Sequence, residues 1–388
     1  MDPKRRFTDR GRDRGQRGVR SAPRTAMALA AAVGAALTAT AIKPAEADVS
    51  LPPVTVGAGV QASFYDCDKA CIYSPGTVPA ADSSVDGFAL NSIRLYVNGN
   101  VTDQIKMTFN TEYTADNGVE VMDAIGRFEF SDMVNIWAGR FLPPSDRANL
   151  YGPYYANDWA PYADGVADYY PDVAVGRDNG VAYWGQFGIL KVQLGAFDGQ
   201  SLNSAVADRS KVLGAARLTL DFWDPEPGYY LNGTFYGDKN ILSLGAAGQT
   251  QDGDSTFDID GLMEKKLAGA GAVTVEAEYE RDDGLTATTH SDGWYGLVAY
   301  VFPQVVGIGK FQPLVKYSDK TFDSTGGTFY TPYVASHELK TTEVNLNYII
   351  KEFNARVGLY YLHQAGFISP TLGVISPSEW GLKMQLQM

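Results

Sequence analysis

The chain has 388 residues, of which 45% are hydrophobic, and its formal net charge is −13 at pH 7. This acidic balance excludes nucleic acid as an expected partner, because a negative surface repels phosphates. The 23 tyrosines and 18 phenylalanines favour strands, and the 41 glycines favour turns. Beyond the leader, no run reaches the roughly 18 apolar residues of a membrane-spanning helix, so entry into a membrane would require strands.

Residues 1–47 have the pattern of an export signal. Arginines are frequent, residues 26–42 are apolar, and Ala-Glu-Ala at 45–47 is typical of a cleavage site. The Arg-Arg-Phe at 5–7 also permits a twin-arginine signal, although an ordinary secretory signal accounts for the whole leader. We expect a cleaved signal peptide and a mature chain of residues 48–388. The leader holds ten Lys/Arg and four Asp/Glu, so the mature net charge is −19.

The two cysteines, Cys67 and Cys71, follow the first predicted strand. In an exported protein this spacing favours a small disulfide that closes a loop. Two thiols without a neighbouring histidine do not complete a four-ligand zinc site. We therefore expect no metal and no cofactor.

Alternation with period two is the strongest structural signal in the chain. At 105–114, "IKMTFNTEYT" places apolar residues on one face and polar residues on the other. The same pattern recurs at 213–223, at 273–280 and at 343–351, where the polar face carries charged residues. Repeated segments of about ten residues with one apolar and one charged face indicate an all-β, transmembrane, antiparallel up-and-down barrel.

Connections between the predicted strands alternate between short and long. The stretches "NVTDQ", "SDMVN" and "GQFG" are short turns. Short periplasmic turns and long external loops are the expected asymmetry of such a barrel. The long connections are 66–87, 142–177, 281–292, 319–336 and 365–377.

The number of strands is ambiguous from sequence alone. A bacterial barrel requires an even number, and the weakest region is 224–272, so we predict sixteen strands, with eighteen as the second choice. The seventeen candidate segments are centred near 60, 95, 109, 125, 138, 183, 193, 217, 233, 245, 261, 276, 297, 313, 344, 358 and 383.

The stretch "IWAGRFLPPSDRANLYGPYYANDW" resembles the phosphate-selective porins of the O and P type. Gly139, Arg140, Phe141, Pro143 and Arg147 carry the resemblance. It implies an outer-membrane channel, commonly a homotrimer, with a long inward-folding loop at 142–177 and an anion site made of basic residues. Further similar stretches are "SIRLYVNGNVTDQIKMTFNTEY", "AARLTLDF", "EAEYERDD", "GWYGLVAYVF" and "FQPLVKYSD".

The sequence departs from this family in the charge of the long loop. Residues 142–190 contain no lysine and two arginines. A phosphate cannot be desolvated without counter-charge, so this composition argues against phosphate selectivity. The loop region instead holds six aspartates, Asp146, Asp158, Asp164, Asp168, Asp172 and Asp178.

Candidate pore residues come from the polar faces and from the root of the long loop. We expect either a transverse field that screens solutes or cross-strand pairs that hold the barrel's shape. The candidates for the constriction are Arg140, Asp146, Arg147 and Arg177. The candidates for the pore lining are Arg94, Lys106, Glu112, Arg127, Glu129, Arg217, Glu276, Lys316 and Arg356.

Two other classes of function remain open from the sequence. The stretch His290-Ser291-Asp292 has the residue types of a hydrolase, but adjacent residues in one loop do not provide triad geometry. A non-conducting barrel could also serve as a scaffold or adhesin. Our prediction is a non-enzymatic porin for passive diffusion of small hydrophilic solutes or ions, in contact with outer-membrane lipid and lipopolysaccharide.

Overall fold

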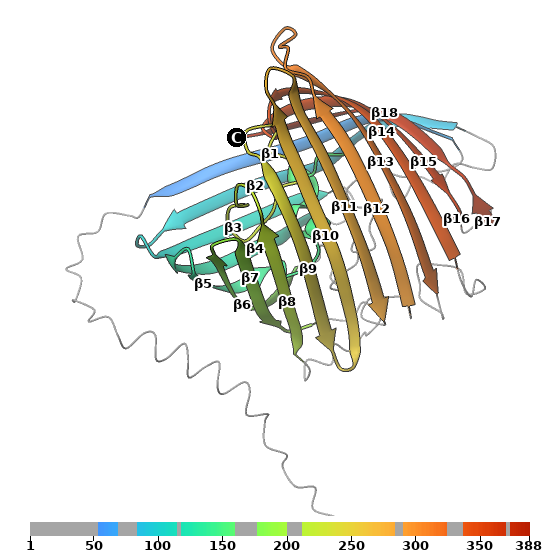
Figure 1. Cartoon of the computed structure of the whole chain (residues 1–388). Coiled ribbons are helices and arrows are strands. Elements are labelled where there is room, and N and C mark those ends of the chain that lie inside the picture. Colours follow the sequence, from blue (N-terminus) through green and yellow to red (C-terminus); the bar gives the residue numbers. More distant parts are fainter. Residues whose placement is uncertain are drawn as a thin grey trace, which may run out of the picture. The chain divides into compact units, whose positions relative to one another are not determined.

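Sixteen antiparallel strands close into a barrel in the computed structural model (Figure 1), as predicted. The structure describes residues 53–68, 84–114, 118–159, 177–199, 212–283, 290–323, 337–369 and 373–388. The barrel strands are β1 (Val54–Asp68), β2 (Ser84–Asn100), β3 (Ile105–Thr114), β4 (Gly118–Ser131), β5 (Val134–Phe141), β6 (Asp178–Phe187), β7 (Leu190–Phe197), β8 (Leu213–Asp221), β9 (Ile241–Gln251), β10 (Asp254–Leu267), β11 (Gly271–Asp283), β12 (His290–Val301), β13 (Lys310–Asp323), β14 (His337–Lys351), β15 (Ala355–Ala365) and β18 (Ser378–Gln387).

The ring closes where β1 pairs with β18, which also pairs with β15. Backbone bonds between Ala58 and Met388, at 3.0 and 2.9 Å, complete the seam near the chain's C-terminus. Between β15 and β18, β16 (Phe367–Ser369) and β17 (Gly373–Ile375) form a separate two-stranded sheet. A closed ring leaves no unpaired strand edge, and a chain surrounded by hydrocarbon requires that closure.

The seventeenth predicted segment, centred near residue 233, is not a strand. Residues 222–240 connect β8 to β9 without a ladder. Positive φ angles at Gly228 (74°), Tyr236 (52°) and Gly237 (86°) break the extended conformation. Tyr229 and Leu231 of this segment are buried by packing inside the barrel. Apolar residues placed for such packing resemble the alternation of a strand.

The two faces of the barrel have inverted polarity compared with a soluble protein. On β11, Glu276, Glu278 and Glu280 are buried, whereas Ala277 and Tyr279 on the other face are exposed. Charged residues are rarely buried, and large exposed apolar surfaces mark contact with a partner or a membrane. Among the described residues, no helix is both long and apolar enough to cross a membrane.

Aromatic side chains form two belts on the exposed face. Towards the long loops, Trp294 and Tyr317 pack with ring centroids 5.5 Å apart. Towards the short turns, Phe311 and Tyr348 pack at 5.1 Å. Exposed aliphatic residues such as Val315 lie between the belts. This order matches a transmembrane barrel, in which aromatic residues sit at the two interfaces and aliphatic residues meet the acyl chains.

Replacing Val315 by arginine tests which part of the surface meets hydrocarbon. Val315 is 52% exposed and pairs with Val298 and Val344. We expect Val315→Arg to lower the free energy of unfolding from lipid vesicles by about 2–4 kcal/mol. The control is Val305→Arg in the β12–β13 turn, 64% exposed, for which we expect a loss of about 0–1 kcal/mol. Unfolding is measured by guanidinium titration. Equal losses in the two variants would contradict the assignment of Val315 to the hydrocarbon-facing part of the surface.

Candidate functional site

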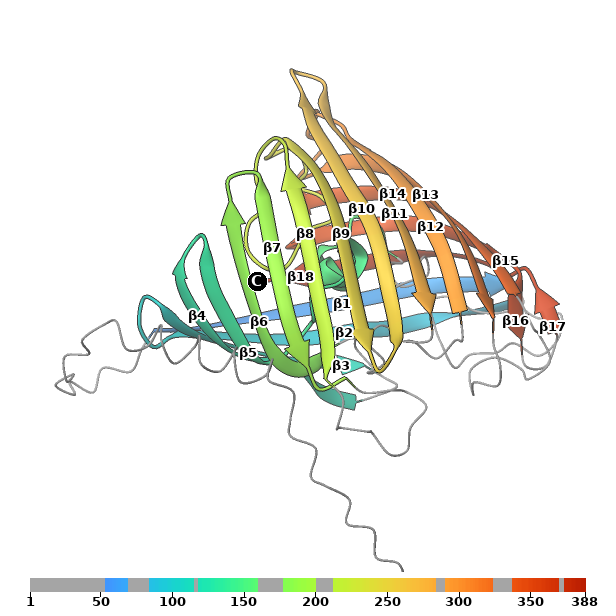
Figure 2. The same cartoon turned by 60° about the horizontal axis from the view of Figure 1, so that its bottom comes forward.

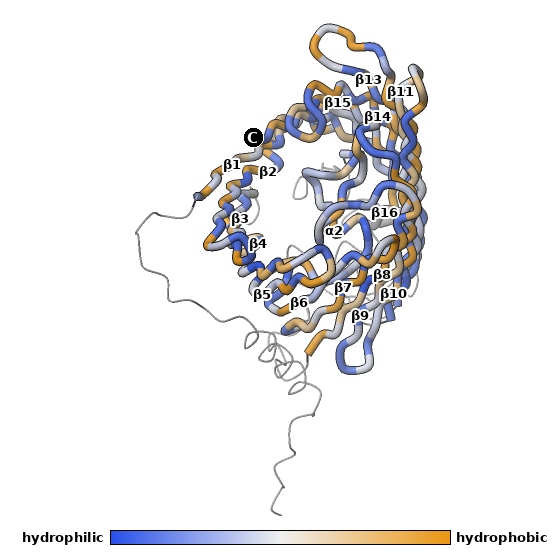
Figure 3. Tube along the Cα trace, turned by 60° about the vertical axis from the view of Figure 1, so that its left-hand side comes forward, coloured by the Kyte–Doolittle hydropathy of each residue, from blue (hydrophilic) through white to orange (hydrophobic). Residues whose placement is uncertain are grey.

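The first part of the long loop lies inside the ring of strands. We call residues 142–159 the inner loop; its helix α2 (Arg147–Tyr155) is enclosed by the barrel in Figures 2 and 3. Asp146 caps the helix by accepting a 2.7 Å bond from the backbone N–H of Asn149. Residues 142–159 of the predicted long loop therefore lie inside the barrel, while residues 160–176 lie outside the described residues.

Two aromatic side chains of the inner loop fill places on the inner wall where the strands carry glycine. A Cβ on Gly59 would meet the ring of Tyr154 at 2.6 Å, and one on Gly358 would meet Trp159 at 2.2 Å. Trp159 Nε1 also donates to Asn347 Oδ1 at 2.7 Å. The inner loop is thus fitted to the wall by shape, because no other residue type leaves room for these rings.

A second segment enters the lumen from the opposite end. Residues 222–240, which we call the second inner segment, leave the barrel end that carries the short turns. The N–H of Leu231 donates to Leu150 O at 3.4 Å, and that of Gly233 donates to Tyr155 O at 2.9 Å. Reasoning from the sequence missed this contact, because the buried residues of this segment resemble one more strand.

Arg147 joins the inner loop, the second inner segment and the wall. Its fully buried guanidinium lies 2.5 Å from Glu226 and 3.4 Å from Asp260, and it donates to Asn232 O at 3.2 Å. Burial by itself lowers the pKa of Arg147, but the carboxylates of Glu226 and Asp260 outweigh it and raise that pKa above its ordinary value. Arg147 therefore stays charged and holds three parts of the chain together.

Several predicted pore-lining residues bind the inner loop rather than facing open lumen. Arg217 donates to Ser145 O at 3.1 Å and to both oxygens of Asp260. Lys316 lies 2.6 Å from Asp158. These side chains use their charge to fix the loop, as does Arg356, whereas Glu276 is bonded to the wall strand β12. Arg356 donates to Ala156 O at 2.8 Å, and buried Glu276 accepts from Tyr295 at 2.7 Å.

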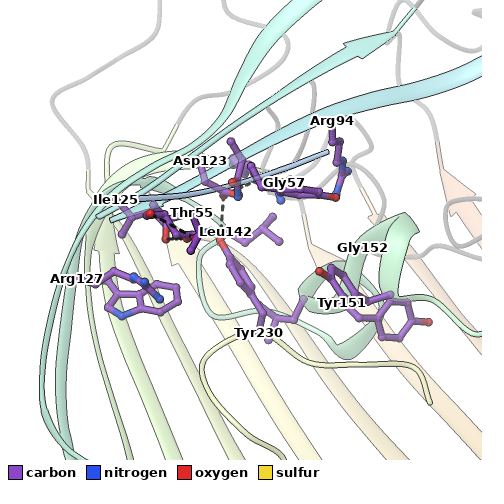
Figure 4. Close-up of a pocket in the computed structure, with 18 of the residues that line it drawn as sticks. Thr55, Gly57, Arg94, Asp123, Ile125, Arg127, Leu142, Tyr151, Gly152 and Tyr230 are labelled. Carbon is purple, nitrogen blue, oxygen red and sulfur yellow. Dashed lines mark hydrogen bonds and ion pairs between the residues drawn. The ribbon is translucent and has the colours of Figure 1, made fainter. Parts of the chain in front are cut away.

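On the other side of the inner loop, a cavity of about 470 Å³ adjoins β1 to β5 (Figure 4). Arg94, Arg127 and Arg177 line it from three positions of the sequence. Their carboxylate partners belong to the same wall. Arg94 lies 3.0 Å from Glu112, Arg177 lies 2.8 Å from Asp123, Arg127 lies 3.6 Å from Glu129, and Lys106 lies 2.8 Å from Glu129.

Tyrosines complete the lining of this cavity. Tyr230 comes from the second inner segment, and its hydroxyl donates to Asp123 at 3.0 Å, as the dashed line in Figure 4 shows. Tyr151 comes from the inner loop. The cavity is therefore bounded by the wall on one side and by both inward segments on the other. The sequence identified the arginines but not Tyr230.

Arg140 lies apart from this group. It pairs with Ala124 across β4 and β5, and Ala124 pairs with Phe109 of the apolar face. Partners in a ladder share one face of the sheet, so Arg140 belongs to the outer surface. Its Nε donates to Val121 O at 3.1 Å.

The predicted disulfide is described only in part. Cys67 is fully buried on β1, but Cys71 lies outside the described residues, so their pairing stays a prediction.

The hydrolase-like stretch 290–292 lies at the start of β12. Ser291 is buried, whereas His290 and Asp292 belong to the opposite face of β12. The three side chains are therefore not brought together. Within the described residues, no His, Cys, Asp or Glu group is arranged to hold a metal.

No protein-family model matches the chain, and no curated protein matches it. Solved structures do match. Pseudomonas putida OprB has 10% sequence identity and a TM-score of 0.57 over 87% of this chain and 94% of its own. The channel DcaP of Acinetobacter baumannii has 11% identity and a TM-score of 0.55, covering 89% and 100%.

The barrel has the fold of bacterial outer-membrane porins. An anion-selective porin from Comamonas acidovorans, at 15% identity and a TM-score of 0.53, covers 87% of this chain and 99% of its own. At such low identity the likeness concerns the fold alone. The pairing of wall arginines with carboxylates and the second inner segment are features of this chain.

Removing the charge of Arg147 tests its role as the central contact. We expect Arg147→Met to lower the free energy of unfolding by about 3–5 kcal/mol, because Glu226 would be left buried without its cation. Adding Glu226→Gln to this variant should recover part of the loss. Guanidinium titrations of both variants in vesicles measure this, and an unchanged midpoint for Arg147→Met would refute it.

Proposed function

We propose that the protein is an outer-membrane porin through which small hydrophilic solutes or ions diffuse passively. The observation that carries this proposal is the arginine-lined cavity of about 470 Å³ inside a closed barrel whose exterior is apolar. A wet, charge-lined path through a hydrocarbon-facing cylinder is what passive permeation of polar solutes requires. Export through a cleaved signal peptide at 1–47 belongs to the proposal.

The distribution of charge favours screening by size and by local field rather than a dedicated phosphate site. Arg94 and Arg177 are each neutralised by a carboxylate within about 3 Å. Arg127 is the least compensated, because it lies 3.6 Å from Glu129, and that carboxylate also accepts from Lys106 at 2.8 Å. Arg127 is therefore our candidate for the residue that sets ionic preference, and Arg94, Arg177 and Tyr230 shape the path.

A second candidate function is a barrel that does not conduct. The inner loop and the second inner segment fill part of the lumen and are bonded to each other. Such filling suits a scaffold or adhesin, whose lumen needs no open path. A homotrimeric assembly and contact with lipopolysaccharide follow from the resemblance to porins and are part of the proposal for either function.

Single-channel recording in planar bilayers separates these functions. A porin gives stepwise conductance, whereas silence under all voltages supports the scaffold. In a KCl gradient we expect Arg127→Glu to shift the reversal potential towards cation preference by on the order of 10 mV, because the charge at the path is reversed. The matched control is Arg140→Glu, the same exchange on the outer surface, for which we expect no shift. Equal shifts in both variants would remove Arg127 from the path.

A further inference from the structure

Four carboxylates meet where the start of α2 lies against β10 and β11. We call Asp146, Asp258, Glu278 and Glu280 the carboxylate cluster. None is more than 6% exposed. Glu278 and Asp258 each face Asp146 and Asp260, and Glu280 faces Asp146 and Asp258. The cluster therefore joins the inner loop to the wall through groups of like charge.

Glu280 is the member that points to a bound species. It is 2% exposed, and neither of its carboxylate oxygens has a hydrogen-bond partner. One oxygen of Asp146 and one of Asp258 are buried and unbonded as well. A buried carboxylate without a donor is strongly unfavourable unless a cation or a proton accompanies it.

The two arginines nearest the carboxylate cluster are already engaged by other carboxylates. Arg217 binds both oxygens of Asp260 at 2.5 and 2.8 Å and reaches Asp258 only at 3.7 Å. Arg147 is held by Glu226 and Asp260. The other charged or titratable groups that face the cluster or its neighbours are Lys320, Asp282, Glu276, Tyr295 and Lys316.

The geometry favours protons over a metal ion as the missing positive charge. Within the described residues, no three acidic, histidine or cysteine side chains surround a common metal position. Carboxylates that face one another in a dry site can share protons without a coordination shell. We propose that the carboxylate cluster is a proton-binding site that fastens the inner loop to the wall, and that loss of its protons releases the loop.

The link from protons to the loop passes through the first turn of α2. The backbone N–H of Ala148 donates to Glu278 Oε2 at 3.4 Å, and Asp146 caps the same turn. The N-terminus of a helix stabilises one negative charge nearby. When the wall carboxylates of β10 and β11 are ionised, they repel one another and Asp146. Because these carboxylates belong to paired strands, the inner loop is the partner that moves away.

The direction of the pH effect follows from Asp146. Burial, aided by the charge of Asp260, raises the pKa of Asp146 to about 7. A carboxyl group released into water has a pKa of about 4. The fastened loop thus binds more protons than the released loop, and fastening weakens as pH rises from about 4 through about 7. Below that range the site is fully protonated and the loop is held most firmly.

Conductance as a function of pH is the first test, and it rests on the proposed channel function. At one fixed KCl concentration we expect wild-type conductance to rise roughly twofold between about pH 5 and pH 9. Glu280→Gln and Glu278→Gln, which keep shape and remove charge, should stay near the low-pH value throughout. The control Asp283→Asn removes an exposed acidic charge from the same strand, and it should keep the wild-type rise.

A second readout does not depend on conduction. Trp159 is 1% exposed at the end of the inner loop. The difference in acrylamide quenching between the wild type and a Trp159→Phe variant reports the exposure of Trp159. We expect this difference to increase with pH in the wild type. In a Glu280→Gln background it should stay constant. If quenching increases with pH in a barrel that shows no conductance, the proton site is supported and the channel function is refuted. Conductance that is steady with pH together with unchanged quenching would overturn the proton site.

A metal ion is tested in the same preparation. Addition of Ca²⁺ or of a chelator should leave the quenching curve unchanged if protons occupy the site. If the quenching curve moves to higher pH with Ca²⁺ and returns with chelator, the site binds a metal ion rather than protons. That result would overturn the proposal.

Discussion

The whole structure depends on one constraint: backbone polar groups that face hydrocarbon must be bonded within the chain. Sixteen strands satisfy it by closing through β1 and β18. Closure separates an outer surface, where aliphatic side chains lie between aromatic belts, from an interior that is free to hold charge. The inner loop, the second inner segment and the cavity all lie in that interior.

The interior charges have two uses, divided between the two sides of the lumen. On the side of β8 to β15, basic groups such as Arg217 and Lys316 bind the inner loop. On the side of β1 to β5, Arg94, Arg127 and Arg177 border the cavity. The inner loop therefore separates these two sides and is bonded by charged groups on one of them.

Much of the barrel could be predicted because alternation with period two depends only on local sequence. Strands such as β3 and β11 were predicted with the correct face. The expected asymmetry of turns and loops has an exception in residues 222–240, a long connection at the end that carries the short turns. The extra segment near residue 233 was wrong, because alternation cannot distinguish a strand from a chain buried inside a barrel. The candidate site was predicted less well: Arg140 shares the polar character of Arg147 but lies on the outer face.

By itself the sequence determined the class of the fold, the number of strands to within one and, apart from Arg140, the charged residues that face inward. These follow from the polarity of neighbouring residues. Only the tertiary structure decided which of those charges border the cavity and which are buried against the inner loop. It also decided that residues 222–240 enter the lumen and that Glu280 has no partner. These facts depend on contacts between residues far apart in the chain, and no local pattern encodes them.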